Sequence, residues 1–378
     1  MKKLFITIAL VMTAIFTLTG CGLGGGGGCS GGSVGISYNT AWTNVAEDTL
    51  GLKESLTYSV DYQDDLTIGK VSYKNTIDKT KIDFSYGKGT YTTTLTVVKA
   101  EKSLLGEKSS EVLNAIVDST DQSVVKRLYK YETSLSIPFS YKYGDMTETV
   151  TTVDTIKTES YFLLSDNAYA PVYSKSEYNM SFVGVGKETF VERQHYDTET
   201  IYNLDKATTS TTVYYTKTEG ENLEGAVADQ RTTEAKYSYK SVIDNTSLLF
   251  VMRSISLGDT GNTLGVYTHV YTTPKKLNIT AGEAQAEKYN ITLNGNAIPE
   301  EEIQLNAYSF VLNTAKGCSS GPNTGRSQIV YTNKNGETPY ASIGSNRTMV
   351  MRYIEPLIEY QSYLSMGALV YSLTEINF

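Results

Sequence analysis

The chain has 378 residues, with 33 Lys and Arg against 41 Asp and Glu, so its net charge is −8. This acidic balance, without any block of Lys or Arg, argues against nucleic acid and anionic lipid head groups as partners. Because His195 and His269 are the 2 histidines and neither belongs to a zinc-binding spacing, we expect no metal site and no cofactor.

Residues 1–20 have the pattern of an export signal. Lys2 and Lys3 precede an apolar stretch, residues 4–18, which is shorter than the roughly 20 residues that a membrane span needs. Leu18-Thr19-Gly20-Cys21 then matches a lipobox, so the start of the chain resembles the bacterial lipoproteins. The resemblance implies cleavage before Cys21, a diacylglyceryl group on its thiol, and export of the chain. The protein would then be anchored to the outer face of the cell membrane or within the envelope of a bacterium; a plain signal peptide that happens to end in Cys is the alternative.

Residues 21–37 are interpreted as the lipidated Cys and a tether. The segment from Gly22 to Gly35 is mostly Gly, cannot bury apolar surface, and is typical of a flexible spacer. Cys29 lies in this tether and Cys318 in a Gly/Ser-rich loop. Export to an oxidising space permits a disulfide between them, and two unpaired thiols are the alternative.

Residues 38–378 are predicted to form an all-β body. The chain contains 30 Tyr, and apolar and polar residues alternate over 56–62, 81–86 and 264–271, which is typical of half-buried strands. Asn294-Gly295 and Asn335-Gly336 predict tight hairpin turns, so neighbouring strands should pair mainly antiparallel. We expect a curved sheet, or an open or half barrel, in one lobe or in two lobes with a seam near 272–290.

Two or three short helices should accompany the sheet. The strongest pattern is at 244–256, where Leu248, Leu249 and Met252 fall on one helical face behind candidate capping residues. Weaker patterns occur at 111–119 and at 355–364, where Pro356 would occupy the first turn.

Tyrosines at i and i+2 are the feature that most suggests ligand binding. Each such pair should project from one face of its strand, and a curved sheet lined in this way suits a lipid or another amphiphilic ligand. The helix at 246–256 would fill the concave side. The alternative is that the tyrosines stabilise the sheet through cross-strand pairs. The candidate binding residues are Tyr129, Tyr131, Tyr141, Tyr143, Tyr237, Tyr239, Leu248, Leu249 and Met252.

Three stretches of the body, ESLTYSV (54–60), DNTSLLFVMRSISLG (244–258) and GALVYSL (367–373), are similar to a family of β-rich proteins of the bacterial envelope. The resemblance implies an antiparallel sheet curled around a helix, like the folds of periplasmic lipoprotein carriers. Lipid binding follows only by analogy of fold. The polar stretch 99–127 departs from this plan.

These patterns favour a membrane-anchored, non-enzymatic lipoprotein that binds an apolar or amphiphilic ligand or an envelope partner through its Tyr-rich sheet. Two other functions remain open. The chain could be an envelope hydrolase whose carboxylates are brought together only by the fold, or an adhesion or scaffolding module with an exposed Tyr-rich patch.

Overall fold

A computed structural model describes the sheet and its connections, and all structural statements below concern the described residues. Those residues are 36–39, 50–99, 127–165, 168–203, 208–219, 230–236, 242–258, 262–267, 275–282, 285–298, 302–312, 327–335, 338–339, 347–359 and 362–378.

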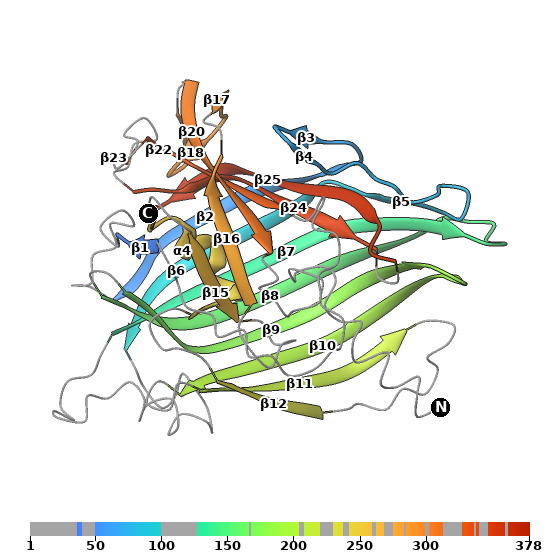
Figure 1. Cartoon of the computed structure of the whole chain (residues 1–378), viewed down its shortest axis with the longest axis horizontal. Helices are drawn as coiled ribbons and strands as arrows, with labels where there is room; N and C mark the ends of the chain where they lie inside the picture. Colours follow the sequence, from blue (N-terminus) through green and yellow to red (C-terminus); the bar gives the residue numbers. More distant parts are fainter. Residues whose placement is uncertain are drawn as a thin grey trace.

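The molecule is built on one large, strongly curved sheet (Figure 1). Along its main path of pairing, neighbouring strands are antiparallel, except that β13 and β15 are parallel. Within the described residues no pairing joins β12 to β13, the two ends of the path, so the sheet is open. In order of pairing the strands are β12 (Gln230–Lys236), β11 (Thr208–Glu219), β10 (Thr189–Asn203), β9 (Ala168–Val185), β8 (Val150–Ser165), β7 (Arg127–Tyr143), β6 (Gly89–Lys99), β2 (Gly51–Gln63), β25 (Ser365–Asn377), β24 (Val350–Ile358), β21 (Gln328–Thr332), β20 (Glu302–Leu312), β16 (Lys275–Ala281), β15 (Thr263–Tyr267) and β13 (Val242–Asp244).

Short strands extend the edges of this sheet or form separate pairs. On the main sheet, β5 pairs with β7, β17 with β20, and the hairpin of β18 and β19 with β25. Separate two-stranded pairs are β1 with β14, β3 with β4, and β22 with β23. Their bounds are β1 (Ile36–Tyr38), β3 (Thr67–Ile68), β4 (Val71–Ser72), β5 (Ile82–Tyr86), β14 (Ile255–Leu257), β17 (Gln285–Lys288), β18 (Thr292–Leu293), β19 (Asn296–Ala297), β22 (Lys334–Asn335) and β23 (Thr338–Pro339).

The alternation in the sequence decides which side chains face inward. In β7, Tyr131, Leu135 and Ile137 are buried on the inner, concave face, whereas Glu132 and Ser134 between them lie on the outer face and are partly exposed. A period of two separates the side chains in this way because successive residues of a strand point to opposite faces. The prediction of an all-β, mainly antiparallel, curved sheet is confirmed.

The turn between β18 and β19 is the one that its sequence predicts. Asn294 and Gly295 have φ values of 48° and 78°, so both central residues are in the left-handed region. A type I′ turn requires this conformation at both positions, which Asn and Gly adopt most readily.

The helical predictions are partly wrong. A 3-10 turn, η3 (Asn245–Ser247), leads into the short helix α4 (Leu248–Met252), and Asp244 caps the turn by accepting a hydrogen bond from the Thr246 amide. The helix ends earlier than predicted because Ile255 already pairs with Tyr38 in the β1–β14 ladder.

The first part of the segment 355–364, predicted as a helix, is instead the end of β24. Its residues pair with β25, and Pro356 lies opposite Ala368 next to a β-bulge. Proline is tolerated there because a bulge leaves a residue without a ladder hydrogen bond. The prediction at 111–119 falls outside the described residues, in which α4 and η3 are the only helical elements.

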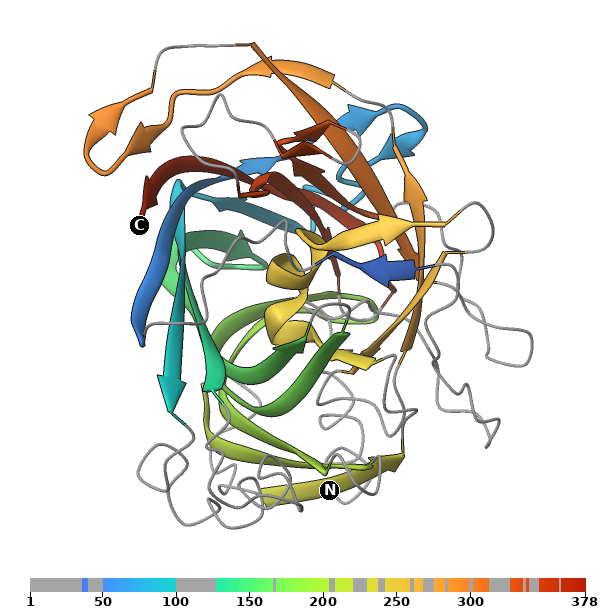
Figure 2. The ribbon, with the colours of Figure 1, turned by 90° about the vertical axis from the view of Figure 1, so that its left-hand side faces the viewer.

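The core lies on the inner face of the sheet, where α4 packs (Figure 2). Phe250 of α4 contacts Tyr131 and Phe162, with ring centroids 5.6 and 5.2 Å apart, and Met252 is fully buried. These rings fill the concavity with apolar surface, and such burial is the main stabilising contribution to a fold.

A buried ion pair ties α4 to the sheet. The Arg253 guanidinium at the end of α4 donates two hydrogen bonds to the Glu54 carboxylate of β2, and its Nε donates to the Thr348 carbonyl at 2.6 Å. Arg347 lies 3.3 Å from the same carboxylate. Glu54 and Arg253 are 0% and 2% exposed, so each charge depends on the other for its stabilisation.

Breaking this pair should destabilise the fold strongly. Glu54→Gln should lower the free energy of unfolding in urea by roughly 3 to 5 kcal/mol, because it leaves the buried Arg253 charge uncompensated. Glu177→Gln, which removes the exposed partner of Lys157, is the control and should cost less than about 1 kcal/mol. Equal, small losses in both variants would contradict the role assigned to the buried pair.

Candidate functional site

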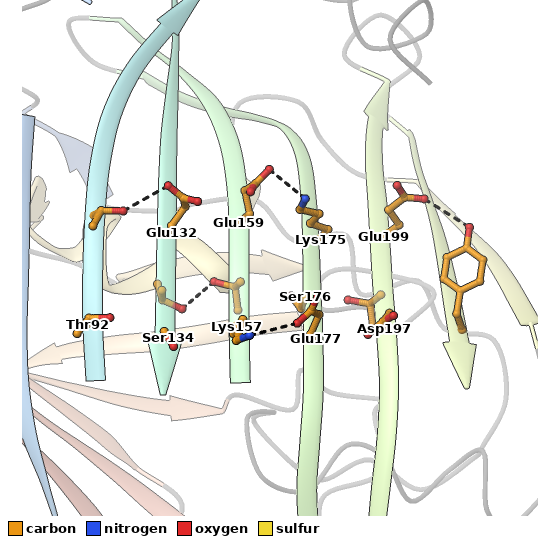
Figure 3. Close-up of a pocket in the computed structure, with 15 residues that line it drawn as sticks. Thr92, Glu132, Ser134, Lys157, Glu159, Lys175, Ser176, Glu177, Asp197 and Glu199 are labelled. Atoms are coloured by element: carbon orange, nitrogen blue, oxygen red, sulfur yellow. Dashed lines mark hydrogen bonds and ion pairs between the residues drawn. The ribbon is translucent and has the colours of Figure 1, made fainter. Parts of the chain in front are cut away.

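A trough lies on the outer face of the sheet. It crosses β6 to β11 and has a volume of about 670 Å³. Figure 3 shows the side chains that line it. This volume lies within the range of roughly 300–1,000 Å³ that is typical of ligand pockets. The lining differs from the usual apolar pocket, because charged and hydroxyl side chains form its floor.

Cross-strand register arranges these side chains in two parallel rows. In each row, directly paired residues of neighbouring strands follow one another across the sheet, which brings their Cβ atoms to within roughly 5 Å of each other. The first row is Thr92, Ser134, Lys157, Glu177, Asp197 and Tyr214. The second row is Thr94, Glu132, Glu159, Lys175 and Glu199.

The second row places two carboxylates face to face and bridges them with lysines. Lys130 Nζ lies 2.8 Å from Glu132 and 3.1 Å from Glu159, and Lys175 Nζ lies 3.4 Å from Glu159. Partial burial alone would raise the pKa of Glu159, but the hydrogen bond from Tyr161 and the charge of Lys130 outweigh it and lower that pKa. Glu159 is therefore a stable anion at neutral pH.

The first row contains a second facing pair, Glu177 and Asp197, that is less well compensated. Lys157 lies 3.8 Å from Glu177. Within the described part of the chain, the Asp197 Oδ1 atom is buried and has no hydrogen-bond partner. Burial, followed by the nearby Glu177 charge, raises the pKa of Asp197. This pair is where the trough has most unused capacity to accept a hydrogen bond or a positive charge.

A second, much smaller cavity of about 60 Å³ lies on the inner face, between the sheet and the α4 region. Leu248 and Leu249 border it on one side and Glu355 on the other, and several tyrosines line it. Its volume is well below that of pockets that hold drug-sized ligands.

Glu355 is the chemically unusual residue of this cavity. The side chain is 2% exposed, and its carboxylate accepts a hydrogen bond from the Tyr371 hydroxyl at 2.8 Å. Burial raises the pKa of Glu355 to about 8, although the Tyr371 hydrogen bond acts in the opposite direction. Without a compensating charge, this carboxyl is mainly protonated at neutral pH.

The four described tyrosines predicted to bind a ligand lie in or against the core of the inner face. Tyr129 stacks on Phe162 with centroids 5.7 Å apart, and Tyr131 packs against α4. Tyr141 and Tyr143 stack on each other, 6.1 Å apart, and are only partly buried.

The remaining predicted residues are divided between the cavity, the core and the undescribed part of the chain. Leu248 and Leu249 border the small cavity, whereas Met252 is fully buried. Tyr237, Tyr239, Cys21, Cys29 and Cys318 fall outside the described residues. The ligand-binding roles and the disulfide therefore stay predictions.

The trough residues were not singled out from the sequence, although a signal for them exists. Four successive strands each carry two charged residues at i and i+2, the spacing that places both on one face of a strand. A search for charged rather than tyrosine pairs at this spacing would have found them. The four pairs are Lys130 and Glu132, Lys157 and Glu159, Lys175 and Glu177, and Asp197 and Glu199.

Comparisons with protein-family models, with curated proteins and with solved structures give no match. Searches of the described residues find no helix with the length and apolar character to cross a membrane, and no cluster of His, Cys, Asp and Glu that could hold a metal ion. The site must be interpreted from its own geometry.

The raised pKa of Glu355 predicts how stability changes with pH. The folded state holds the Glu355 proton up to about pH 8, whereas the unfolded chain releases it near the ordinary pKa of 4.5. The stabilisation that Glu355 contributes to the folded state is therefore complete below pH 4.5 and is lost as the pH rises to 8. Wild type should lose roughly 4 kcal/mol more of its unfolding free energy across this window than Glu355→Gln.

Urea titrations in bis-Tris and Tris buffers measure this difference. Burial raises the pKa of Asp154 to about 6, so this residue also makes stability depend on pH. Its effect is the same in both proteins and cancels in the difference between them. Glu148→Gln, in the exposed turn after β7, is the control and should follow wild type. Parallel curves for wild type and Glu355→Gln would show that this carboxyl ionises normally.

Proposed function

We propose that the chain is an exported, lipid-anchored, non-enzymatic binding protein of the bacterial envelope. The anchor is Cys21, at the end of the lipobox Leu18-Thr19-Gly20-Cys21, and residues 22–35 link it to β1, whose first two residues lie within the predicted tether. The trough on the outer face, with its volume of about 670 Å³, is the observation that carries the binding role. The inner face supports that role less well, because its cavity of about 60 Å³ has no room for an acyl chain.

The charge of the trough indicates the chemistry of its ligand. Five carboxylates and two lysines line it, so it favours a ligand that carries positive charge and hydroxyl groups. An amphiphilic ligand would place its polar, cationic part in the trough. The Glu177 and Asp197 carboxylates are the groups best placed to accept hydrogen bonds from a ligand amine, because they are the least compensated facing pair of the trough.

The same facing carboxylates favour a second candidate, hydrolysis of an envelope glycan. Glycoside hydrolysis needs two carboxyl groups across a cleft, one of them with a raised pKa to serve as the acid. Asp197, with its raised pKa, and Glu177 opposite it on the next strand supply two carboxyl groups of this kind on the floor of the trough. Binding remains the preferred function because Lys157 lies between these carboxylates and Ser134, where it compensates charge in the row.

The anchor is tested with the full-length protein produced in a bacterial host. The native chain should float with phosphatidylethanolamine and phosphatidylglycerol vesicles, and mass spectrometry of its mature N-terminal peptide should reveal a diacylglyceryl group on Cys21. Cys21→Ser should lose both properties, because the acyl chains supply the membrane affinity. Flotation of Cys21→Ser, or an unmodified native terminus, would refute lipid anchoring.

The trough is tested with a glucosamine oligomer, whose amines are cationic, against the N-acetylated oligomer of the same length. Glu177→Gln combined with Asp197→Asn should weaken binding of the cationic oligomer about tenfold or more, which corresponds to about 1.4 kcal/mol. Glu188→Gln, in the exposed turn between β9 and β10, should leave binding unchanged.

The N-acetylated oligomer should bind weakly to every variant in this assay. Equal binding of both oligomers would refute a charge-selective trough. Shortening of either oligomer by wild type, but not by the double variant, would establish the hydrolase instead.

A further inference from the structure

Glu355 and Gln328 bring two oxygen-bearing side chains to the same wall of the inner cavity. Both residues line the cavity, and they come from the paired strands β24 and β21. The pairing of Ile329 with Ile354 places Gln328 and Glu355 opposite each other at the next position of the ladder. The Tyr353 ring lies beside them on the same face.

Neither side chain is fully satisfied by the described residues. Gln328 is 5% exposed, and its Oε1 atom has no hydrogen-bond partner. Glu355 is 2% exposed, with Tyr371 as its hydrogen-bond donor, and within the described ranges no Lys or Arg forms an ion pair with it. A buried amide oxygen without a partner is costly, and a buried carboxyl can ionise at neutral pH only beside a positive charge, so the two groups together form a place that a cation would stabilise.

The cavity has enough space for such a partner. A cavity of about 15 Å³ is enough for one water molecule. The inner cavity, at about 60 Å³, therefore admits a small ion together with water. Tyr91 and Tyr371 add hydroxyl groups to the lining, whereas Leu248 and Leu249 close the opposite side. A bulky organic cation would not fit.

We propose that the inner cavity binds one small monovalent cation, such as potassium, sodium or ammonium, between the Glu355 carboxylate and the Gln328 Oε1 atom. One carboxylate balances a single positive charge, whereas calcium and magnesium sites usually recruit further carboxylates or keep several waters. Neutral amide oxygens of the Gln328 type are suitable partners for a monovalent ion, as in the carbonyl sites of potassium channels. This site is separate from the outer trough and does not depend on the proposed function.

Cation binding must compete with protonation of Glu355. The other titratable groups that face this carboxyl are Tyr86, Tyr91, Tyr353 and Tyr371, from β5, β6, β24 and β25. Burial raises the pKa of each of these tyrosines well above its ordinary value, so all four stay neutral at physiological pH. The cation should therefore exchange with one proton, that of Glu355, and its affinity should rise about tenfold per pH unit below pH 8.

The experiment compares urea unfolding of the full chain in potassium, sodium, ammonium and choline chlorides at one ionic strength. At least one of the small cations should shift the unfolding midpoint to higher urea relative to choline, and the shift should grow between pH 6 and pH 8. The shift should vanish in Glu355→Gln and persist in Glu148→Gln, whose carboxyl lies in the exposed turn after β7. Crystals grown in rubidium chloride provide a measurement without substitution, and an anomalous peak between Glu355 and Gln328 is expected.

Several results would overturn the proposal. Equal midpoints in all four chlorides would mean that the cavity holds only water. A cation-dependent shift that survives in Glu355→Gln would place the ion elsewhere, and stabilisation by calcium but by none of the monovalent ions would refute the assigned charge. If Glu355→Gln does not fold, the absence of a rubidium peak in the wild-type crystal refutes the site.

Discussion

The cross-strand register of β6 to β11 is the constraint on which the rest of the structure depends. Because successive side chains alternate between faces, one register sends Tyr131, Leu135 and Ile156 into the core and sends Glu132, Lys157 and Glu159 to the outer face. A slip by one residue would exchange the two sets and bury a row of charges. The apolar inner face therefore fixes the outer rows as well, and the geometry of the trough is a consequence of core packing.

The inner face is closed by long-range contacts that also explain why so little space remains there. Asp244, just before η3, accepts hydrogen bonds from Ser174 and Tyr202 of the sheet and from Thr246 of η3. At the other end of α4, Arg253 is held by Glu54. With both ends of the helix region tied to the sheet by buried polar contacts, the rings between them pack closely. Gln328 Oε1, which finds no partner among the described residues, borders the cavity that is left.

The sequence predicts the local features of this fold much better than the distant ones. Strands of period two and the Asn294-Gly295 turn depend on neighbouring residues, so their patterns are legible in one segment. The Glu54–Arg253 pair joins residues 199 positions apart, and no local pattern marks it. For the same reason the segment at 355–364 suggested a helix, since its pairing partners in β21 and β25 are absent from its own sequence. The trough is partly predictable. Its charged i, i+2 pairs are local features of the sequence, but their assembly into rows depends on the cross-strand register.

The proposed anchor and the negative charge of the folded body together favour one orientation of the body relative to the membrane. Loss of the signal removes Lys2 and Lys3 and no acidic residue, so the mature chain would carry a net charge of −10 where the whole chain carries −8. An anionic membrane surface repels such a body within a Debye length of about 8 Å at physiological salt. The repulsion acts on the carboxylate-rich outer face of β6 to β11, which should therefore turn away from the bilayer. Under the proposed function, a trough in that orientation would be presented to cationic partners in the surrounding envelope, and the lipid would confine it there without competing for it.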